Sequence, residues 1–239
     1  MTINAFSHNI PEKTFAKLNR DGEYTRLAVS PGIINKHYTP AQFQTIAEVV
    51  GVSGSIKYSA SYSMLLSVPT IELTTAKRKL EKAGLYIAKQ GQIVAMKACD
   101  FCDGDKMEAA QITEDLYQQL EGLEVPSRIH INMNGCASAC YNAVYDDIGL
   151  VYQKDSFDVY LGAVPMGKNA QAGELFVKKV PVQDIENLLK EIIGLYKELA
   201  HHKEPFYKFY KRTKGADYWQ TIKNHLGNSN DTKKHLNMP

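Results

Sequence analysis

The sequence predicts an α+β fold in two parts, a half domain of mixed strands and helices followed by an α/β domain. Three observations support this. The first ninety residues alternate strand and helix patterns, the later residues pair strands with one long amphipathic helix, and all four cysteines lie in the middle of the chain, within this later part. We expect an extension over 1–22, a half domain over 23–90, a cysteine domain over 91–200 and a basic aromatic tail over 201–239.

The composition is that of an ordinary globular protein. Of 239 residues, 44% are hydrophobic and 23% charged, with a net charge of +2, which excludes a disordered chain. No run of 18 apolar residues occurs, so no membrane span is expected. The first fifteen residues lack the apolar stretch of a signal peptide, and we expect a cytoplasmic protein.

The half domain begins with a strand at Arg26–Val29, which Ser30-Pro31-Gly32 ends. Thr39 is a typical N-cap before Pro40, and Gly51 ends the helix that follows. The remaining elements are strands at 55–60 and 63–68, a helix over 73–83 and a strand at 85–88. This β-α-β-β-α-β order predicts a ferredoxin-like half domain.

The second part has its own strand and helix signals. Strands are expected at 93–96, 128–133, 148–152 and 157–161, and helices at 104–120 and 183–199. Residues 203–226 mix aromatic and basic side chains. This pattern occurs in nucleic-acid-binding segments, but it also fits a terminal helix that packs its aromatic face on the domain, and we expect no nucleic acid partner.

The four cysteines form two close pairs, Cys99 with Cys102 and Cys136 with Cys140. In a reducing compartment such pairs indicate a metal site. Thiolates suit either zinc or an iron–sulfur cluster. The C-x3-C pair follows Gly135, which favours a cluster in a tight turn where backbone N–H groups can reach sulfur.

The segment from Asn134 to Cys140 resembles the second cysteine pair of the sirohaem-containing nitrite and sulfite reductase family. Residues 147–151 and 159–163 are similar to that family's DIGL segment and to its later strand ending in Gly-Gly. The weaker similarity extends over about 24–226. It includes Pro31-Gly32-Ile33-Ile34 in the half domain and Gly215-Ala216-Asp217-Tyr218 near the end.

The resemblance implies a [4Fe–4S] cluster on Cys99, Cys102, Cys136 and Cys140, with Cys140 bridging to a sirohaem iron. It implies an oxidoreductase that passes single electrons to a small bound oxyanion, sulfite or nitrite. Sirohaem carries eight carboxylates, so its pocket needs cations. The resemblance suggests Lys57, Lys97, Lys106 and Lys168 for this purpose, and also assigns Arg26 and Asn134 to cofactor binding.

Catalytic residues are less defined. Lys97, Lys106 and His130 are candidates, the last because it precedes the cysteine turn and could donate a proton. The alternation of the strand places His130 on the face opposite Ile129 and Ile131, which favours a surface residue over a catalytic one.

The sequence departs from the family at three places. The first cysteine pair is C-x2-C instead of C-x5-C. Ser59-Ala60-Ser61-Tyr62 stands where the family has Thr-x-Arg-Gln. Serine has neither the positive charge of arginine nor its bidentate hydrogen-bond donors. Ala28 stands where another arginine is expected, and Arg26 is the nearest substitute.

These departures leave other functions open. One is a degenerate relative that keeps the cluster, lacks sirohaem and serves as an electron carrier or accessory protein. Another is a zinc-stabilised binding domain. No G-x-G-x-x-G fingerprint occurs, so we expect a separate electron donor such as a ferredoxin or flavoprotein, docked on the basic tail. Family members carry two such repeats, so one repeat here suggests a homodimer.

Overall fold

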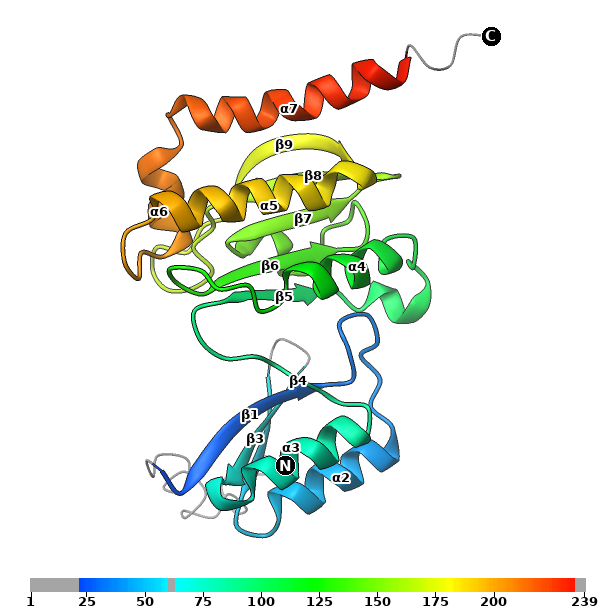
Figure 1. The fold of residues 1–239 in the computed structure, drawn as a ribbon. Helices are drawn as coiled ribbons and strands as arrows, with labels where there is room; N and C mark the ends of the chain where they lie inside the picture. The colour runs from blue at the N-terminus through cyan, green and yellow to red at the C-terminus, as the bar shows by residue number, and fades with distance from the viewer. Residues whose placement is uncertain (1–21, 60–62, 235–239) are drawn as a thin grey trace, which may run out of the picture. The chain divides into compact units, whose positions relative to one another are not determined.

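The computed structural model describes residues 22–59 and 63–234, with side chains described as far as 225. The chain divides at Ala88 into two compact units (Figure 1). Ser61, where the family has arginine, lies outside the described residues.

The first unit is a four-stranded antiparallel sheet covered by two helices. The strands are β1 (Tyr24–Ser30), β2 (Ser55–Tyr58), β3 (Met64–Pro69) and β4 (Tyr86–Ile87), in the order β2-β3-β1-β4. The helices are α2 (Pro40–Val50) and α3 (Leu73–Lys82), the latter preceded by a 3-10 turn, η1 (Thr70–Glu72). This is the ferredoxin-like arrangement that the sequence predicts.

Local signals explain why these elements form where they do. Thr39 accepts a hydrogen bond from the backbone of Gln42, while the Gln42 side chain accepts one from Thr39, which completes a capping box at the start of α2. Leu27 and Leu66 from the strands are fully buried with Ile46 and Leu80 from the helices. The half domain therefore has a core of its own.

The second unit is built on a five-stranded mixed sheet in the order β5-β6-β7-β8-β9. The strands are β5 (Val94–Ala98), β6 (Ile129–Asn134), β7 (Ile148–Tyr152), β8 (Ser156–Leu161) and β9 (Glu174–Pro181). The first three run parallel, and β7, β8 and β9 pair antiparallel. A parallel pair places the carboxyl ends of both strands at the same edge of the sheet.

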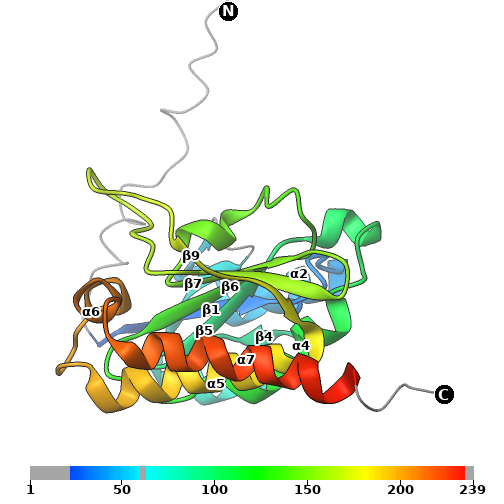
Figure 2. The same cartoon turned by 90° about the horizontal axis from the view of Figure 1, so that it is seen from above.

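Helices cover the apolar face of this sheet. Ile129, Ile131 and Met133 alternate along β6 and are fully buried. The helices are α4 (Ala110–Leu120) and α5 (Val182–Leu199), with α7 (Asp217–Lys234) packed beside α5 (Figure 2). The alternation also confirms that His130, which is partly exposed, lies on the other face.

Three sequence expectations need correction. Strand β9 was not predicted, because Lys178 and Lys179 interrupt its alternation and a bulge shifts its register against β8. The helix expected over 104–120 begins later, as α4 at Ala110, and a 3-10 turn, η2 (Phe101–Gly104), comes before it. The aromatic segment forms two helices, α6 (Phe206–Thr213) and α7.

The expected packing of that aromatic segment is confirmed. Phe206, Phe209 and Trp219 are buried, and the Phe206 and Phe209 rings meet Tyr196 of α5 edge to face at 5.3 and 5.1 Å. These rings therefore hold the tail on the second unit. Across the described part of the chain, no helix combines the length and apolar character needed to span a bilayer.

Candidate functional site

The two cysteine pairs meet because they follow neighbouring parallel strands. Cys99 comes directly after β5, and Cys136 comes two residues after β6. The Cys99 N–H donates to the Met133 carbonyl at 2.9 Å, which continues the sheet to the first thiol. The order of the strands thus brings residues 37 positions apart to one edge of the sheet, and Figure 1 shows β5 and β6 side by side.

The two cysteine loops touch at Gly135. Its N–H donates to the Cys99 Sγ at 3.2 Å. A Cβ at this position would lie 2.6 Å from Cδ1 of Phe101, which is buried, and 3.5 Å from Cys99 Sγ. Only glycine leaves room for this contact, and an N–H donor to a thiolate is a common stabilising feature of iron–sulfur ligation.

The short C-x2-C spacing is made by an unusual backbone. Phe101, Cys102 and Asp103 all have φ of 53°, in the left-handed region. Such residues cost about 1 kcal/mol each, and such strain is concentrated at functional sites. The Asp100 carboxylate accepts the Cys102 N–H at 3.0 Å and steadies the turn. The strained turn leaves Cys102 exposed next to the buried Cys99.

A left-handed backbone conformation also occurs beside the second cysteine pair, Cys136 and Cys140. Ala139 has φ of 45°, directly before Cys140, which is exposed, while Cys136 is half-buried. Two loops with left-handed residues therefore surround the same edge, and each offers one thiol to solvent.

Cys102 lies within electrostatic range of the other three cysteines. Partial desolvation raises the pKa of Cys102, and Cys136, Asp100, Cys140 and Cys99 raise it further, in that order. Yet within the described residues no three His, Cys, Asp or Glu side chains converge closely enough to hold a single ion.

The segment after the second pair is fixed to the sheet by buried polar groups. Asn134, fully buried, accepts the Ala143 N–H through Oδ1 at 3.1 Å. The Asn132 amide donates to Asp146 at 2.7 Å, and Lys97 lies 3.6 Å from the other Asp146 oxygen. These contacts connect the strand before each cysteine loop to the segment that returns from Cys140.

A cavity of about 960 Å³ adjoins the second cysteine loop. Its lining includes Cys136 and Ser138, the carboxylate of Glu108 and three lysines, Lys106, Lys154 and Lys179. Lys106 was predicted to bind a cofactor. Lys154 and Lys179 were missed, because they are far from Lys106 in sequence and only the fold brings them together.

The remaining predicted residues lie elsewhere. Arg26 in β1 and Lys57 in β2 are exposed and belong to the first unit, whereas Lys168 is exposed on the connection between β8 and β9. His130 lies at the amino end of β6, roughly 16 Å along the strand from Gly135. There its ring lies 3.7 Å from Asp147.

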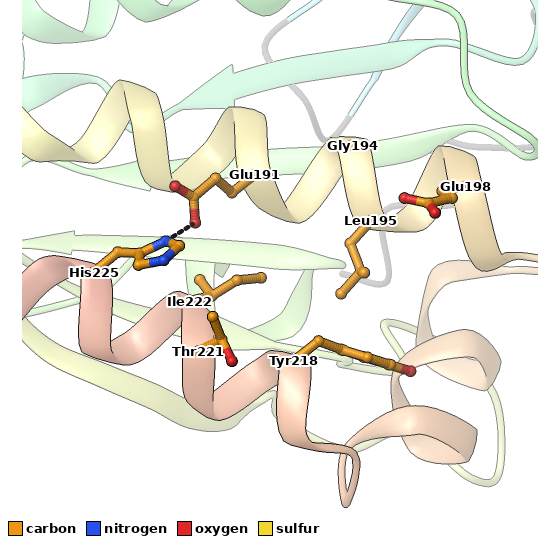
Figure 3. Close-up of a pocket in the computed structure, with 8 residues that line it drawn as sticks. All are labelled: Glu191, Gly194, Leu195, Glu198, Tyr218, Thr221, Ile222 and His225. Carbon is orange, nitrogen blue, oxygen red and sulfur yellow. Dashed lines mark hydrogen bonds and ion pairs between the residues drawn. The ribbon is translucent and has the colours of Figure 1, made fainter.

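A second cavity, of about 480 Å³, lies between α5 and α7 (Figure 3). Leu195 and Ile222 line it, and Glu191 lies 3.4 Å from His225 across it. None of the candidate site residues predicted from the sequence lines this cavity.

Comparisons with known proteins connect this geometry to a family. Residues 93–229, more than half of the chain, match the family described as "Nitrite and sulphite reductase 4Fe-4S domain". A cobalt-factor III methyltransferase of Priestia megaterium is 42% identical over 195 residues, which cover 80% of this chain and 36% of that protein. An assimilatory nitrate reductase electron transfer subunit of Bacillus subtilis is 25% identical over 174 residues, 72% of this chain and 22% of that protein.

The fold has solved relatives as well. Dissimilatory sulfite reductase I superposes with a TM-score of 0.66 over 85% of this chain and 69% of that chain, at 11% identity. At this identity the match concerns the fold alone. The chain spans little more than a third of the length of the Priestia relative and about a fifth of the Bacillus one.

Proposed function

Because the chain belongs to the family of nitrite and sulphite reductase 4Fe-4S domains, we propose that it transfers single electrons through a [4Fe–4S] cluster. Cys99, Cys102, Cys136 and Cys140 would hold this cluster. The observation that carries the proposal is the meeting of both thiol pairs at one sheet edge, with the Gly135 N–H on Cys99 Sγ. When bound, such a cluster accepts and releases one electron at a time.

The protein's own groups would prepare this site for the cluster. The Gly135 N–H partly neutralises charge on the Cys99 sulfur. Asn134 and the Asn132–Asp146 pair fix the loops, so that the thiols are held in place before the cluster binds. The exposed Cys140 is available to a further group, which supports the assignment of Cys140 as the bridging ligand to sirohaem.

The first candidate for the electron acceptor is a sirohaem-bound oxyanion, sulfite or nitrite. This follows the family, and Lys106 at the cavity beside Cys136 supports it, because a macrocycle with carboxylates needs cations there. Electrons would come from a separate donor such as a ferredoxin or flavoprotein.

A second candidate is an accessory redox role without sirohaem. One specific observation favours it, the 42% identity to a protein named for methylating cobalt-factor III. In this role the cluster would supply electrons for chemistry on a compound of that kind.

The absorption spectrum of anaerobically purified protein, measured with its iron content, separates these functions. Sharp porphyrinoid bands with iron indicate sirohaem and a cluster, whereas a broad brown shoulder with iron indicates the cluster alone. A colourless, iron-free protein would overturn the proposal. If a Cys140→Ser variant kept an unaltered haem spectrum, Cys140 would not be the bridge.

A further inference from the structure

The four thiols do not share one environment. Cys99 is 7% exposed and lies beside Gly135, which is buried. Cys102 and Cys140 are exposed to solvent. The candidate cluster site therefore has a dry side at Cys99 and a wet side at the other two thiols. The groups that form the dry side decide how much water reaches a metal centre there.

The ring of Phe101 forms much of this dry side. Phe101 stands between Cys99 and Cys102 in the sequence, and its side chain is 1% exposed. Its Cδ1 and Cε1 atoms lie 2.6 and 2.8 Å from the point where a Cβ of Gly135 would stand, and Cys99 Sγ lies 3.5 Å from the same point. The ring and the first thiol therefore border one small space beside Gly135.

The short turn places the two neighbouring side chains on opposite sides, Phe101 inside and Cys102 outside. Contacts within the protein hold this turn. The Lys106 N–H donates to the Phe101 carbonyl at 3.0 Å, and the Cys102 N–H donates to Asp100 at 3.0 Å. The position of the ring is thus fixed by the chain itself.

The ring offers no polar chemistry of its own. A phenyl group neither binds iron nor carries a proton, whereas the Gly135 N–H donates to Cys99 Sγ. What the ring does is to exclude water from the space next to this sulfur. In such dry surroundings a hydrogen bond is electrostatically stronger, and an added charge is less well stabilised than in water.

We propose that Phe101 is a solvent shield that lowers the reduction potential of the cluster by keeping its Cys99 side dry. This inference rests on the proposed function, because it needs the cluster. Reduction adds one electron and hence one negative charge, which an apolar wall stabilises less than water does. The ring therefore holds the potential below that of a cluster wetted on both sides.

The second unit offers a matched control ring. Phe209 on α6 is also fully buried, and it packs on Tyr196 at 5.1 Å. The Tyr196 hydroxyl lies 3.4 Å from the Ser127 carbonyl, just before β6 begins. Phe209 therefore belongs to the amino edge of the sheet, whereas the cysteines lie at the carboxyl edge.

The shield is tested by redox titration of the cluster-loaded full chain with dithionite. Phe101→Ala admits water to the Cys99 side and should raise the midpoint potential by about 59 mV, which is a ten-fold change in the equilibrium constant for one electron. Phe101→Leu keeps the side chain apolar and should raise the potential by less. Phe209→Leu should leave the potential unchanged.

Air exposure gives a second readout, because the same opening admits water and oxygen. The absorption of the cluster should bleach several-fold faster in Phe101→Ala than in the unmodified protein, with Phe101→Leu between them. Phe209→Leu, which removes the same atoms from a distant ring, should bleach at the rate of the unmodified protein. This control separates shielding from a general loss of stability.

The shield is overturned if loaded Phe101→Ala and Phe101→Leu titrate at or below the potential of the unmodified protein, or bleach no faster than Phe209→Leu. It is also overturned if Phe209→Leu shifts the potential as much as Phe101→Leu. If Phe101→Ala binds no cluster, Phe101→Leu alone decides. If the unmodified protein binds no cluster, the proposed function fails together with the shield, whereas unshifted variants of a loaded protein overturn the shield alone.

Discussion

Gly135 shows how a single residue can determine the candidate metal site. Its N–H contacts the Cys99 sulfur, and its missing side chain admits the Phe101 ring. The sequence indicates that a turn lies here and that N–H groups could reach sulfur. It does not indicate that the ring of Phe101, 34 positions earlier, needs the same space.

Gly135→Ala should therefore destabilise the protein and reduce its iron content. A Cβ would meet Phe101 Cδ1 at 2.6 Å, and such overpacking costs about 1–3 kcal/mol. Gly194→Ala on α5 is the control, because nothing lies within 4 Å of the Cβ position there. This variant should raise the free energy of unfolding by about 0.5–1 kcal/mol. Denaturant unfolding and iron analysis measure both effects. Equal stability of the two variants would contradict this account.

Asn134 gives a second test at the residue scale. Its buried Oδ1 accepts the Ala143 N–H, so Asn134→Ala leaves a buried donor without a partner, at a cost of about 1–3 kcal/mol. The exposed Asn142 is the control, and Asn142→Ala should change the free energy of unfolding by less than about 0.5 kcal/mol. If both variants unfold alike, Asn134 does not anchor the loop.

At the scale of elements, the sequence predicts most strands and helices because their signals are local. Capping by Thr39, the end of α2 at Gly51 and the alternation of Ile129 and Ile131 are each contained in a few residues. Strand β9 escapes prediction because its bulge at Lys179 is stabilised by Asp158, 21 positions away. The lysine-lined cavity escapes prediction for the same reason.

The stability that the ion pair between Arg212 and Glu204 gives to the connection between α5 and α6 should depend on pH. Arg212 donates to both Glu204 oxygens, at 3.1 and 2.7 Å, and lowers the pKa of Glu204 below its ordinary 4.5. A lowered folded pKa gives stability that is present above 4.5 and is lost as the pH falls through the folded pKa. Arg212 is 40% exposed, so the pair contributes at most about 1 kcal/mol.

Glu204→Gln should thus lower the free energy of unfolding by about 0.5–1 kcal/mol at pH 7. The difference from the unmodified protein should shrink as the pH falls from about 5 to 3. The control is Glu186→Gln, which removes the exposed ion pair with Lys190. It should lower the free energy of unfolding by no more than about 0.5 kcal/mol. A Glu204→Gln effect that is constant over this pH range would exclude the ion pair as its source.

At the scale of the whole molecule, the described residues form one half domain and one cysteine domain. We propose that a second copy of the chain supplies the other repeat that the family resemblance implies, with twofold symmetry. Light scattering after size-exclusion chromatography should give twice the mass of one chain, and dilution should shift the mass downward if the association is weak. A mass equal to one chain at high protein concentration would exclude the proposed homodimer.

In the proposed function, the four cysteines would together hold one [4Fe–4S] cluster. The most direct measurement is the iron and acid-labile sulfide content of anaerobically purified protein, compared with the four single Cys→Ser variants. We predict about four sulfides and four irons per chain from the cluster, with a fifth iron where sirohaem is bound, and a marked loss of both in the Cys99, Cys102, Cys136 and Cys140 variants. Protein without iron and sulfide, or protein with one zinc per chain, would contradict the account.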